Sequence, residues 1–320
     1  MKQTSRLWYS MDLEDLIERD HPLRAIKRMV DDALRGMDGD FRNAYSDRGR
    51  PSVAPERLLK ALLLQTLYTI RSERELCRRL KTDMLFRWFL DMTPDEDVFV
   101  PTVFTKNRER LAEHGLTQRF FAGVVQQAIT AGLASDEHFA VDGSLIQSHA
   151  SLKSLKRIAR EADEACESGQ RNRAHIHTAE AEVGEAVSCE ELEAEIVGCV
   201  ERPVACGWAT LAADMGYDSG DFLVALEMEN VRPHIAVRNG VIRAQDEGGD
   251  ARRRARARRQ NRGYQVSQRR RKFVEEFFGW SKTIAGLRRL KHVGRWKIKQ
   301  QVELTAAAYN LVRMRRLMAA

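Results

Sequence analysis

A chain of 320 residues is long enough for two domains, each with its own hydrophobic core. Its composition, with 43% hydrophobic and 31% charged residues, is typical of a globular protein. No apolar run approaches the roughly 18 residues of a membrane span, which argues against a membrane protein. Acidic residues appear near the N-terminus before any apolar stretch, so we expect no secretory signal and a cytoplasmic location.

The net charge of +7 hides a strong asymmetry. Residues 252–320 contain 21 Lys/Arg and 3 Asp/Glu, whereas residues 1–251 contain 32 and 43. A local charge of +18 favours a polyanionic partner such as double-stranded DNA, bound through its phosphates. A membrane surface is disfavoured because this part lacks a clean amphipathic anchor, and a solvated tail is disfavoured by its apolar and aromatic content.

The five cysteines are widely spaced and form no CxxC pair, which fits a reducing compartment better than a disulfide framework. A zinc site remains an alternative, although the spacings match no structural zinc pattern. Its candidate ligands would be Cys166, Cys189, Cys199, Cys206, His175 and His177.

Residues 1–134 are predicted to form an all-helical domain. Apolar residues recur there at spacings of three and four, as on one buried helix face. Pro22 and Pro55 stand where a proline is tolerated, at the start of a helix. Thr102 is a candidate N-cap. The predicted helices cover residues 13–35, 55–70, two short stretches within 71–92, 101–115 and 116–132.

After residue 134 the pattern changes to alternation within residues 137–146, which predicts a strand that ends at Asp142. Residues 209–218 contain a second predicted strand, which ends in the same way at Asp214. A carboxylate at a strand end is fixed by the sheet and accessible from the loop, so both are candidates for catalysis. The chain then predicts a helix capped by Ser219, a strand over 232–241, an arginine-rich loop over 245–263 and a closing helix over 300–318.

The segment 263–289 is predicted to be one helix. Spacings of four and seven place Arg271, Glu275 and Lys282 on one face of it. Such a face could bind a metal ion through the carboxylate and phosphates through the two cations. The alternative is an exposed helix with an ordinary i,i+4 ion pair.

Two carboxylates at strand ends and a third on a later helix suit a two-metal phosphoryl-transfer site. Mg²⁺ prefers oxygen ligands, and a metal pair can stabilise both the attacking and the leaving oxygen. Water or a 3′-hydroxyl then attacks the phosphorus in line, without a nucleophilic side chain.

The order of these blocks resembles that of bacterial insertion-sequence transposases of the Asp-Asp-Glu type. Four N-terminal segments carry the resemblance, together with three catalytic blocks and the C-terminal LTAAAYNLVRM. The N-terminal segments are DLIERDHPLRAI, GRPSVAPERLLKALLLQTLYTIRSERELCRRL, LFRWFLDM and PTVFTKNRERL. The catalytic blocks are DEHFAVDGSLIQSHASLKS, AADMGYDSGDF and QRRRKFVEEFFGWSKTIAGLRRLKHVG.

The resemblance implies an α/β catalytic core, a ribonuclease-H-like mixed sheet flanked by helices, over residues 135–320. An all-helical DNA-binding domain over 1–134 would precede it. It implies that Asp142, Asp214 and Glu275 hold two Mg²⁺ ions, for which Mn²⁺ could substitute. It assigns DNA binding to Arg271, Lys282, Arg288 and Arg289. The implied partners are element ends and target DNA, bound by a homodimer or larger complex.

Two features depart from the family pattern. Gln268 stands where the family has a tyrosine, and Tyr264 is the nearest tyrosine. The acidic segment 151–204 reads as helix-forming where the family has a β-hairpin. A catalytically impaired DNA-binding remnant and a stand-alone metal-dependent nuclease therefore stay as alternatives to an active transposase.

Four polar residues near the aspartates have two interpretations each. Asp218 and Asp221 are candidate ligands, but a turn and a first helical turn explain them as well. Ser144 and His149 could contact DNA, or could simply be structural.

Overall fold

The computed structural model describes residues 12–45, 53–134, 138–144, 146–148, 209–236, 240, 242–243, 246, 248–292 and 294–319. The chain divides into two compact units. The first contains residues 1–134, 281–286 and 300–320, and the second contains 135–280 and 287–299. The predicted acidic segment 151–204, His149 and the candidate zinc ligands lie outside the described residues.

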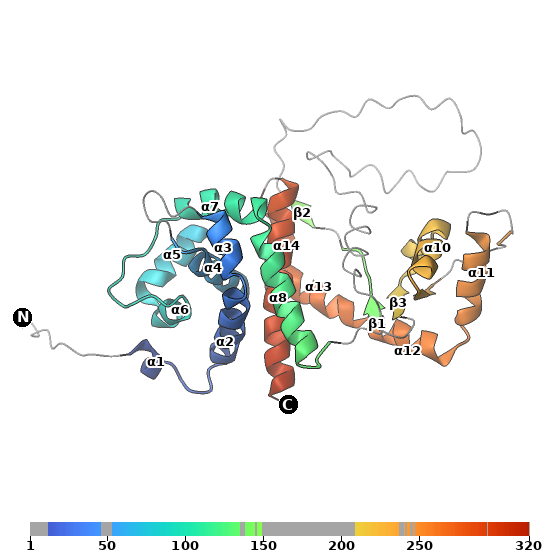
Figure 1. Ribbon diagram of the computed structural model, residues 1–320, viewed down its shortest axis with the longest axis horizontal. Coiled ribbons are helices and arrows are strands. Elements are labelled where there is room, and N and C mark those ends of the chain that lie inside the picture. Colours follow the sequence, from blue (N-terminus) through green and yellow to red (C-terminus); the bar gives the residue numbers. More distant parts are fainter. Residues whose placement is uncertain are drawn as a thin grey trace, which may run out of the picture. The chain divides into compact units, whose positions relative to one another are not determined.

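The described part of the first unit is helical (Figure 1). Its helices follow the apolar spacing of the sequence, and buried leucines of α4 form much of its core. The predicted helix 13–35 is two helices, and α3 was not predicted. The elements are α1 (Leu13–Leu16), α2 (Pro22–Arg35), α3 (Asp38–Ala44), α4 (Pro55–Leu67), α5 (Glu73–Thr82), α6 (Met84–Phe89), α7 (Thr102–Glu113) and α8 (Leu116–Thr130).

Several helix starts have the expected chemistry. Pro22 and Pro55 each occupy the first helical position, and Ser72 caps α5 by accepting a hydrogen bond from the Glu75 N–H. Thr102 is the first residue of α7, whereas Pro101 stands at the N-cap position.

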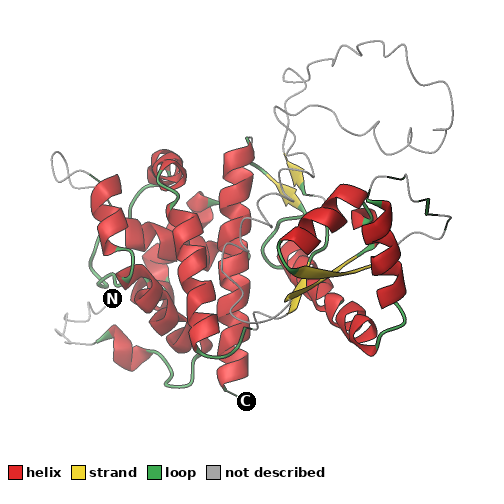
Figure 2. Ribbon diagram, turned by 45° about the vertical axis from the view of Figure 1, so that its right-hand side comes forward, coloured by secondary structure: helices red, strands yellow, loops and turns green. Residues whose placement is uncertain are grey.

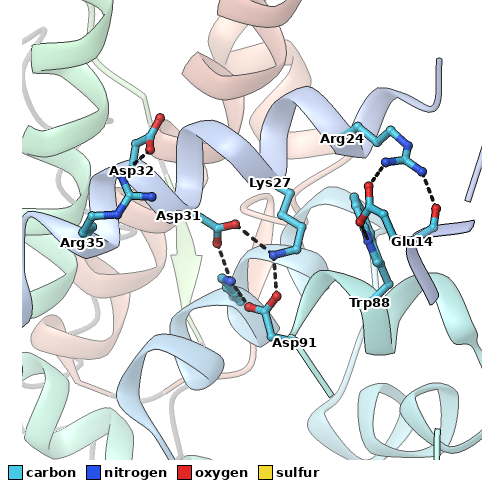
Figure 3. Close-up of polar contacts among 9 residues, drawn as sticks. Glu14, Arg24, Lys27, Asp31, Asp32, Arg35, Trp88 and Asp91 are labelled. Carbon is cyan, nitrogen blue, oxygen red and sulfur yellow. Dashed lines mark hydrogen bonds and ion pairs between the residues drawn. The ribbon is translucent and has the colours of Figure 1, made fainter. Parts of the chain in front are cut away.

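A network of four charged side chains joins α2, α4 and the turn after α6 (Figure 3). Lys60, whose side chain is only 6% exposed, pairs through its ammonium group with Asp31 and Asp91, and the ammonium group of Lys27 pairs with the same two carboxylates. Two cations and two anions cancel, so the charges can lie at a helix junction without a net buried charge.

The last helix, α14 (Arg295–Met318), supplies its C-terminal part to the first unit. Gln300 is buried and donates a hydrogen bond to the Arg108 carbonyl oxygen, and Glu303 accepts one from the Thr117 hydroxyl. The sequence-based division put residues 300–320 in the catalytic domain. In the structure they pack with the first unit, because the apolar face of α14 is buried there.

The second unit contains a small parallel sheet with strand order β1-β3-β4. Its strands are among those drawn in yellow in Figure 2. The strands are β1 (His138–Ala140), β3 (Ala209–Ala213) and β4 (Val231–Ile235). The helix α10 (Gly220–Met228) connects β3 to β4, as a parallel pair requires. A separate parallel pair is formed by β2 (Gln147–Ser148) and β5 (Arg289–Leu290). Apolar side chains of β3, β4, α10 and α11 form the core of the unit.

The arginine-rich loop predicted over 245–263 is wrong, because much of it is the helix α11 (Gly249–Arg258). Alanine and arginine both favour helix, and Ala251 and Ala255, one turn apart, are buried in the core. Gly248, at φ +59°, precedes α11 where its backbone lies against Gly220 at the start of α10, and an added Cβ there would overlap the Gly220 backbone.

The single helix predicted over 263–289 is two helices, α12 (Arg262–Arg271) and α13 (Phe273–Thr283). Lys272 separates them, and the Glu275 N–H bonds to the Lys272 carbonyl oxygen, three residues back, at 3.0 Å. This i→i−3 bond tightens the chain at the junction. Arg271 is therefore the last residue of one helix, while Glu275 and Lys282 belong to the next.

Candidate active site

The two predicted aspartates leave the sheet at matching positions. Ala140 of β1 is the register partner of Ala212 of β3, and the Val141 N–H donates to the Ala212 carbonyl oxygen at 2.9 Å. Asp142 stands two residues after Ala140, and Asp214 stands two residues after Ala212. Neighbouring strands lie about 4.8 Å apart, so parallel pairing brings both half-buried carboxylates to the same sheet edge.

The turn after β3 is ordered around Asp214. Its Oδ1 accepts a hydrogen bond from the Gly216 N–H at 2.8 Å, which caps the 3₁₀ turn η3 (Met215–Tyr217). One carboxylate oxygen is thereby used to hold the loop, while no such bond occupies Oδ2 among the described contacts.

Arg271, at the end of α12, points its guanidinium at the first aspartate. Its Nη1 lies 3.4 Å from Oδ2 of Asp142, and the two side chains are 19% and 17% exposed. The Nε of Arg271 itself and the Oγ of Ser144, two residues after Asp142, are both buried. Neither makes a hydrogen bond within the described part of the chain. Such atoms are available to a ligand, since buried polar groups are normally satisfied.

Asp218 is held away from any ligand role by a structural contact. Its side chain is 0% exposed, and both of its oxygens bind Arg252 of α11, with Nε at 2.9 Å and Nη2 at 2.8 Å. Asp221 is exposed in the first turn of α10. The structure thus supports the structural interpretation of both residues.

The arginines of α11 are largely paired within the second unit. Arg254 and Arg258 both bind Glu227 of α10, and Arg253 binds Asp250. Arg254 and Arg258 lower the pKa of Glu227, most strongly through the hydrogen bond from Arg254. Part of the basic charge counted in the sequence therefore neutralises the protein's own carboxylates.

Glu275 is not gathered with the aspartates. It is exposed on α13, and the described residues contain no group of three His, Cys, Asp or Glu side chains that could hold a metal ion. Arg288 and Arg289 are exposed, and Lys282 is half-buried near the end of α13. The structure brings together Asp142, Asp214 and Arg271 at one sheet edge of the second unit.

The donor set at the sheet edge fits a hard divalent cation in part. Two carboxylates on adjacent strand ends, with the buried Ser144 hydroxyl nearby in the chain, offer the oxygen ligands that Mg²⁺ prefers. A third carboxylate is needed for a metal pair, and Glu275 does not supply it in this arrangement.

Sequence reasoning missed the role of Gln268. Its side-chain amide donates to the carbonyl oxygens of Ala213, at 3.2 Å, and of His234, at the carboxyl ends of β3 and β4. The signal was present, because Gln268 and Arg271 are three residues apart and so share one face of α12.

Two family models match the chain. Residues 11–110 match the model described as Transposase domain (DUF772), and residues 194–311 match the model described as Transposase DDE domain. The second range contains Asp214 and Glu275. Searches of curated proteins and of solved structures gave no match. Among the described residues no helix is long and apolar enough to span a membrane. The two matched models, in this order along the chain, identify the protein as a member of the DDE transposases of insertion sequences.

Proposed function

We propose that this transposase binds the terminal inverted repeats of its own element, cuts the DNA strands there and joins the ends to target DNA. The observation that carries the proposal is the parallel register that places Asp142 and Asp214 at one sheet edge, with Arg271 against the first of them. The protein would act in the cytoplasm on DNA of the nucleoid, as a homodimer or larger complex on paired ends.

Each residue has a proposed role. Asp142 and Asp214 hold the metal ions, and Glu275 completes the ligand set in the complex with DNA, within a ribonuclease-H-like core. Mg²⁺, or Mn²⁺ in its place, would supply charge stabilisation at the reacting phosphate. Arg271 lies beside the ligand set and can hold a phosphate oxygen with its guanidinium. Lys282, Arg288 and Arg289 contact the DNA backbone.

The test is a strand-cleavage and strand-transfer assay with the DNA that flanks the gene, in Mg²⁺ and in Mn²⁺. Asp142→Asn, Asp214→Asn and Glu275→Gln should each remove at least about 99% of the cleavage rate, since each deletes a metal ligand. Asp221→Asn is the matched control, because it removes an exposed carboxylate in the helix that follows Asp214. An Asp142→Asn protein that cleaves like wild type would exclude this site.

A catalytically impaired DNA-binding remnant is the second candidate, and the observation that favours it is the absence of a third carboxylate at the described sheet edge. It predicts specific, salt-sensitive binding to element ends without metal-dependent nicking. A stand-alone nuclease would nick but would not join a 3′ end to target DNA. The same assay separates all three.

A further inference from the structure

We infer that Gln268 is a positioning residue that fixes α12 to the sheet edge, so that Arg271 meets Asp142 and the Asp214 turn keeps its place. The inference rests on the proposed function for its consequence in DNA cleavage, but its structural part stands on contacts of the second unit alone.

Gln268 can make its two bonds in only one orientation. Its neighbours, the main-chain oxygens of Ala213 and His234, both accept hydrogen bonds, and the side-chain amide nitrogen carries two protons. The flipped amide would turn its own oxygen toward two other oxygens. The two adjacent strands are thus joined, at their carboxyl ends, by one side chain from the helix.

The two carbonyl groups bonded by Gln268 lie at the strand ends that lead to the candidate site. Ala213 immediately precedes Asp214, and His234 is the register partner of Ala212 on the neighbouring strand. A side chain that holds the Ala213 carbonyl therefore limits the movement of the next residue along the chain.

The contacts of Gln268 belong to one continuous helix face. Tyr264, Ser267, Gln268 and Arg271 follow the i, i+3, i+4, i+7 pattern. Tyr264 packs edge-on against the His234 ring at 5.8 Å between centroids, and the Ser267 hydroxyl lies 2.7 Å from the His234 Nδ1. The face thus attaches to β4 first, then to the ends of both strands, and one turn later reaches Asp142 through Arg271.

The two residues compared above with the tyrosine of the family, Gln268 and Tyr264, lie at different places on this helix face. Tyr264 is buried against β4, whereas Gln268 lies at the strand ends one turn before Arg271. Gln268 holds the last turn of α12 at the sheet edge, and Arg271 ends this helix just before the interruption at Lys272. Removal of the Gln268 amide should therefore loosen Arg271 more than any other described residue of the site.

The first test needs no DNA. Gln268→Met keeps the length and most of the volume of the side chain, but both N–H donors of the amide are lost. Amide hydrogen exchange of peptides covering 264–272 and 211–217 should accelerate by about fivefold, which corresponds to one hydrogen bond of ordinary net strength. Gln265→Met makes the same chemical change at an exposed position of the same helix and should leave exchange unchanged. Unchanged exchange in Gln268→Met would overturn the inference.

The second test measures cleavage. Gln268→Met should lower the cleavage rate at saturating DNA by about 10- to 100-fold, the effect of a displaced site. It should lower the DNA affinity much less, because Arg271 is one of several proposed DNA contacts. In an Arg271→Ala background, Gln268→Met should lower the cleavage rate by a smaller factor than it does in the wild type, because both substitutions act through the same contact. Full additivity would show that Gln268 only stabilises the fold. A wild-type protein that does not cleave would refute the proposed function, while the exchange result would still decide the role of Gln268.

Discussion

The Arg271 guanidinium Nη1 lies 3.4 Å from the Asp142 Oδ2, at the edge where the two strand-end carboxylates meet. A bound cation at this distance competes with any divalent ion for the same oxygen. A unit-charge pair 3.4 Å apart attracts by about 1 kcal/mol even in a water-like dielectric, and both side chains are partly exposed.

Arg271→Gln should therefore raise the affinity of the protein for Mn²⁺ by about fivefold, since the competing charge is gone. Titration of free Mn²⁺ by electron paramagnetic resonance measures this without DNA. Arg271→Gln combined with Asp142→Asn should lose the gain, because the contested oxygen ligand is removed. Equal Mn²⁺ affinities of Arg271→Gln and wild type would contradict the competition.

The buried pair of Asp218 and Arg252 should be costly to break. Arg252→Met removes the cation that binds both oxygens of a fully buried carboxylate, and we expect the free energy of unfolding to fall by about 3 kcal/mol. Arg252→Met combined with Asp218→Leu removes both charges and should recover part of that loss. Urea denaturation measures both. The control is Arg253→Met, in which an exposed pair with Asp250 is lost, and its effect should stay below about 0.5 kcal/mol.

The strand ends could be predicted from the sequence because alternation and a following glycine mark them locally. Asp142 and Asp214 were found in that way, and the structure adds the parallel register that aligns them. Register depends on which strands pair, and the pairing of β1 with β3 joins segments about 70 residues apart, so no local pattern contains it.

The arginine-rich segment shows why other parts could not be predicted. Its charges suggested an arginine-rich loop. The carboxylates that neutralise these charges, Asp218 and Glu227, come from an earlier turn and helix. The Lys272 interruption is equally hidden, because the apolar and charged spacing of 263–289 suits a continuous helix as well as two. Both outcomes depend on tertiary partners.

The network around Lys60 should stabilise the first unit mainly by avoiding unpaired charge. Burial raises the pKa of Asp91, but hydrogen bonds and charge from Lys27 and Lys60 outweigh this and hold that pKa below its usual value. Lys60→Ala leaves two carboxylates with one cation, and because these carboxylates are partly exposed we expect a loss of only about 2 kcal/mol. Lys60→Met keeps the packing of the side chain, so its loss of unfolding free energy should be smaller.

Urea denaturation of the full chain checks this order. Lys81→Met, at an exposed position on α5, is the matched control and should change stability by less than about 0.5 kcal/mol. Equal stability of Lys60→Ala and wild type would show that the network contributes nothing.

His234 should make the second unit sensitive to acid. Burial lowers its pKa, and the nearby Arg258, His138 and Arg232 lower it further. The unfolded chain then binds a proton more readily than the folded one, so the contribution of neutral His234 is complete above the unfolded pKa of about 6.5 and is lost as pH falls below it.

Urea denaturation at several pH values between about 7.5 and 5.5 should show this loss, with a limiting slope of about 1.4 kcal/mol per pH unit for one proton. His234→Gln, which does not titrate, should remove that part of the slope. His114→Gln, which changes an exposed ring, should retain it. A slope that survives in His234→Gln would assign the acid sensitivity to other groups.

The location of an arginine, rather than the total charge, should decide its effect on DNA binding. Arg288 and Arg289 are exposed beside and within β5, whereas Arg253 and Arg254 already bind Asp250 and Glu227.

Each phosphate contact contributes about 0.9 to the slope of log affinity against log salt concentration. Arg288→Ala with Arg289→Ala should therefore reduce that slope by up to about 1.8. Arg253→Ala with Arg254→Ala removes the same formal charge and should reduce it much less. Fluorescence anisotropy with element-end DNA at several salt concentrations measures both slopes, and equal reductions would show that only net charge matters.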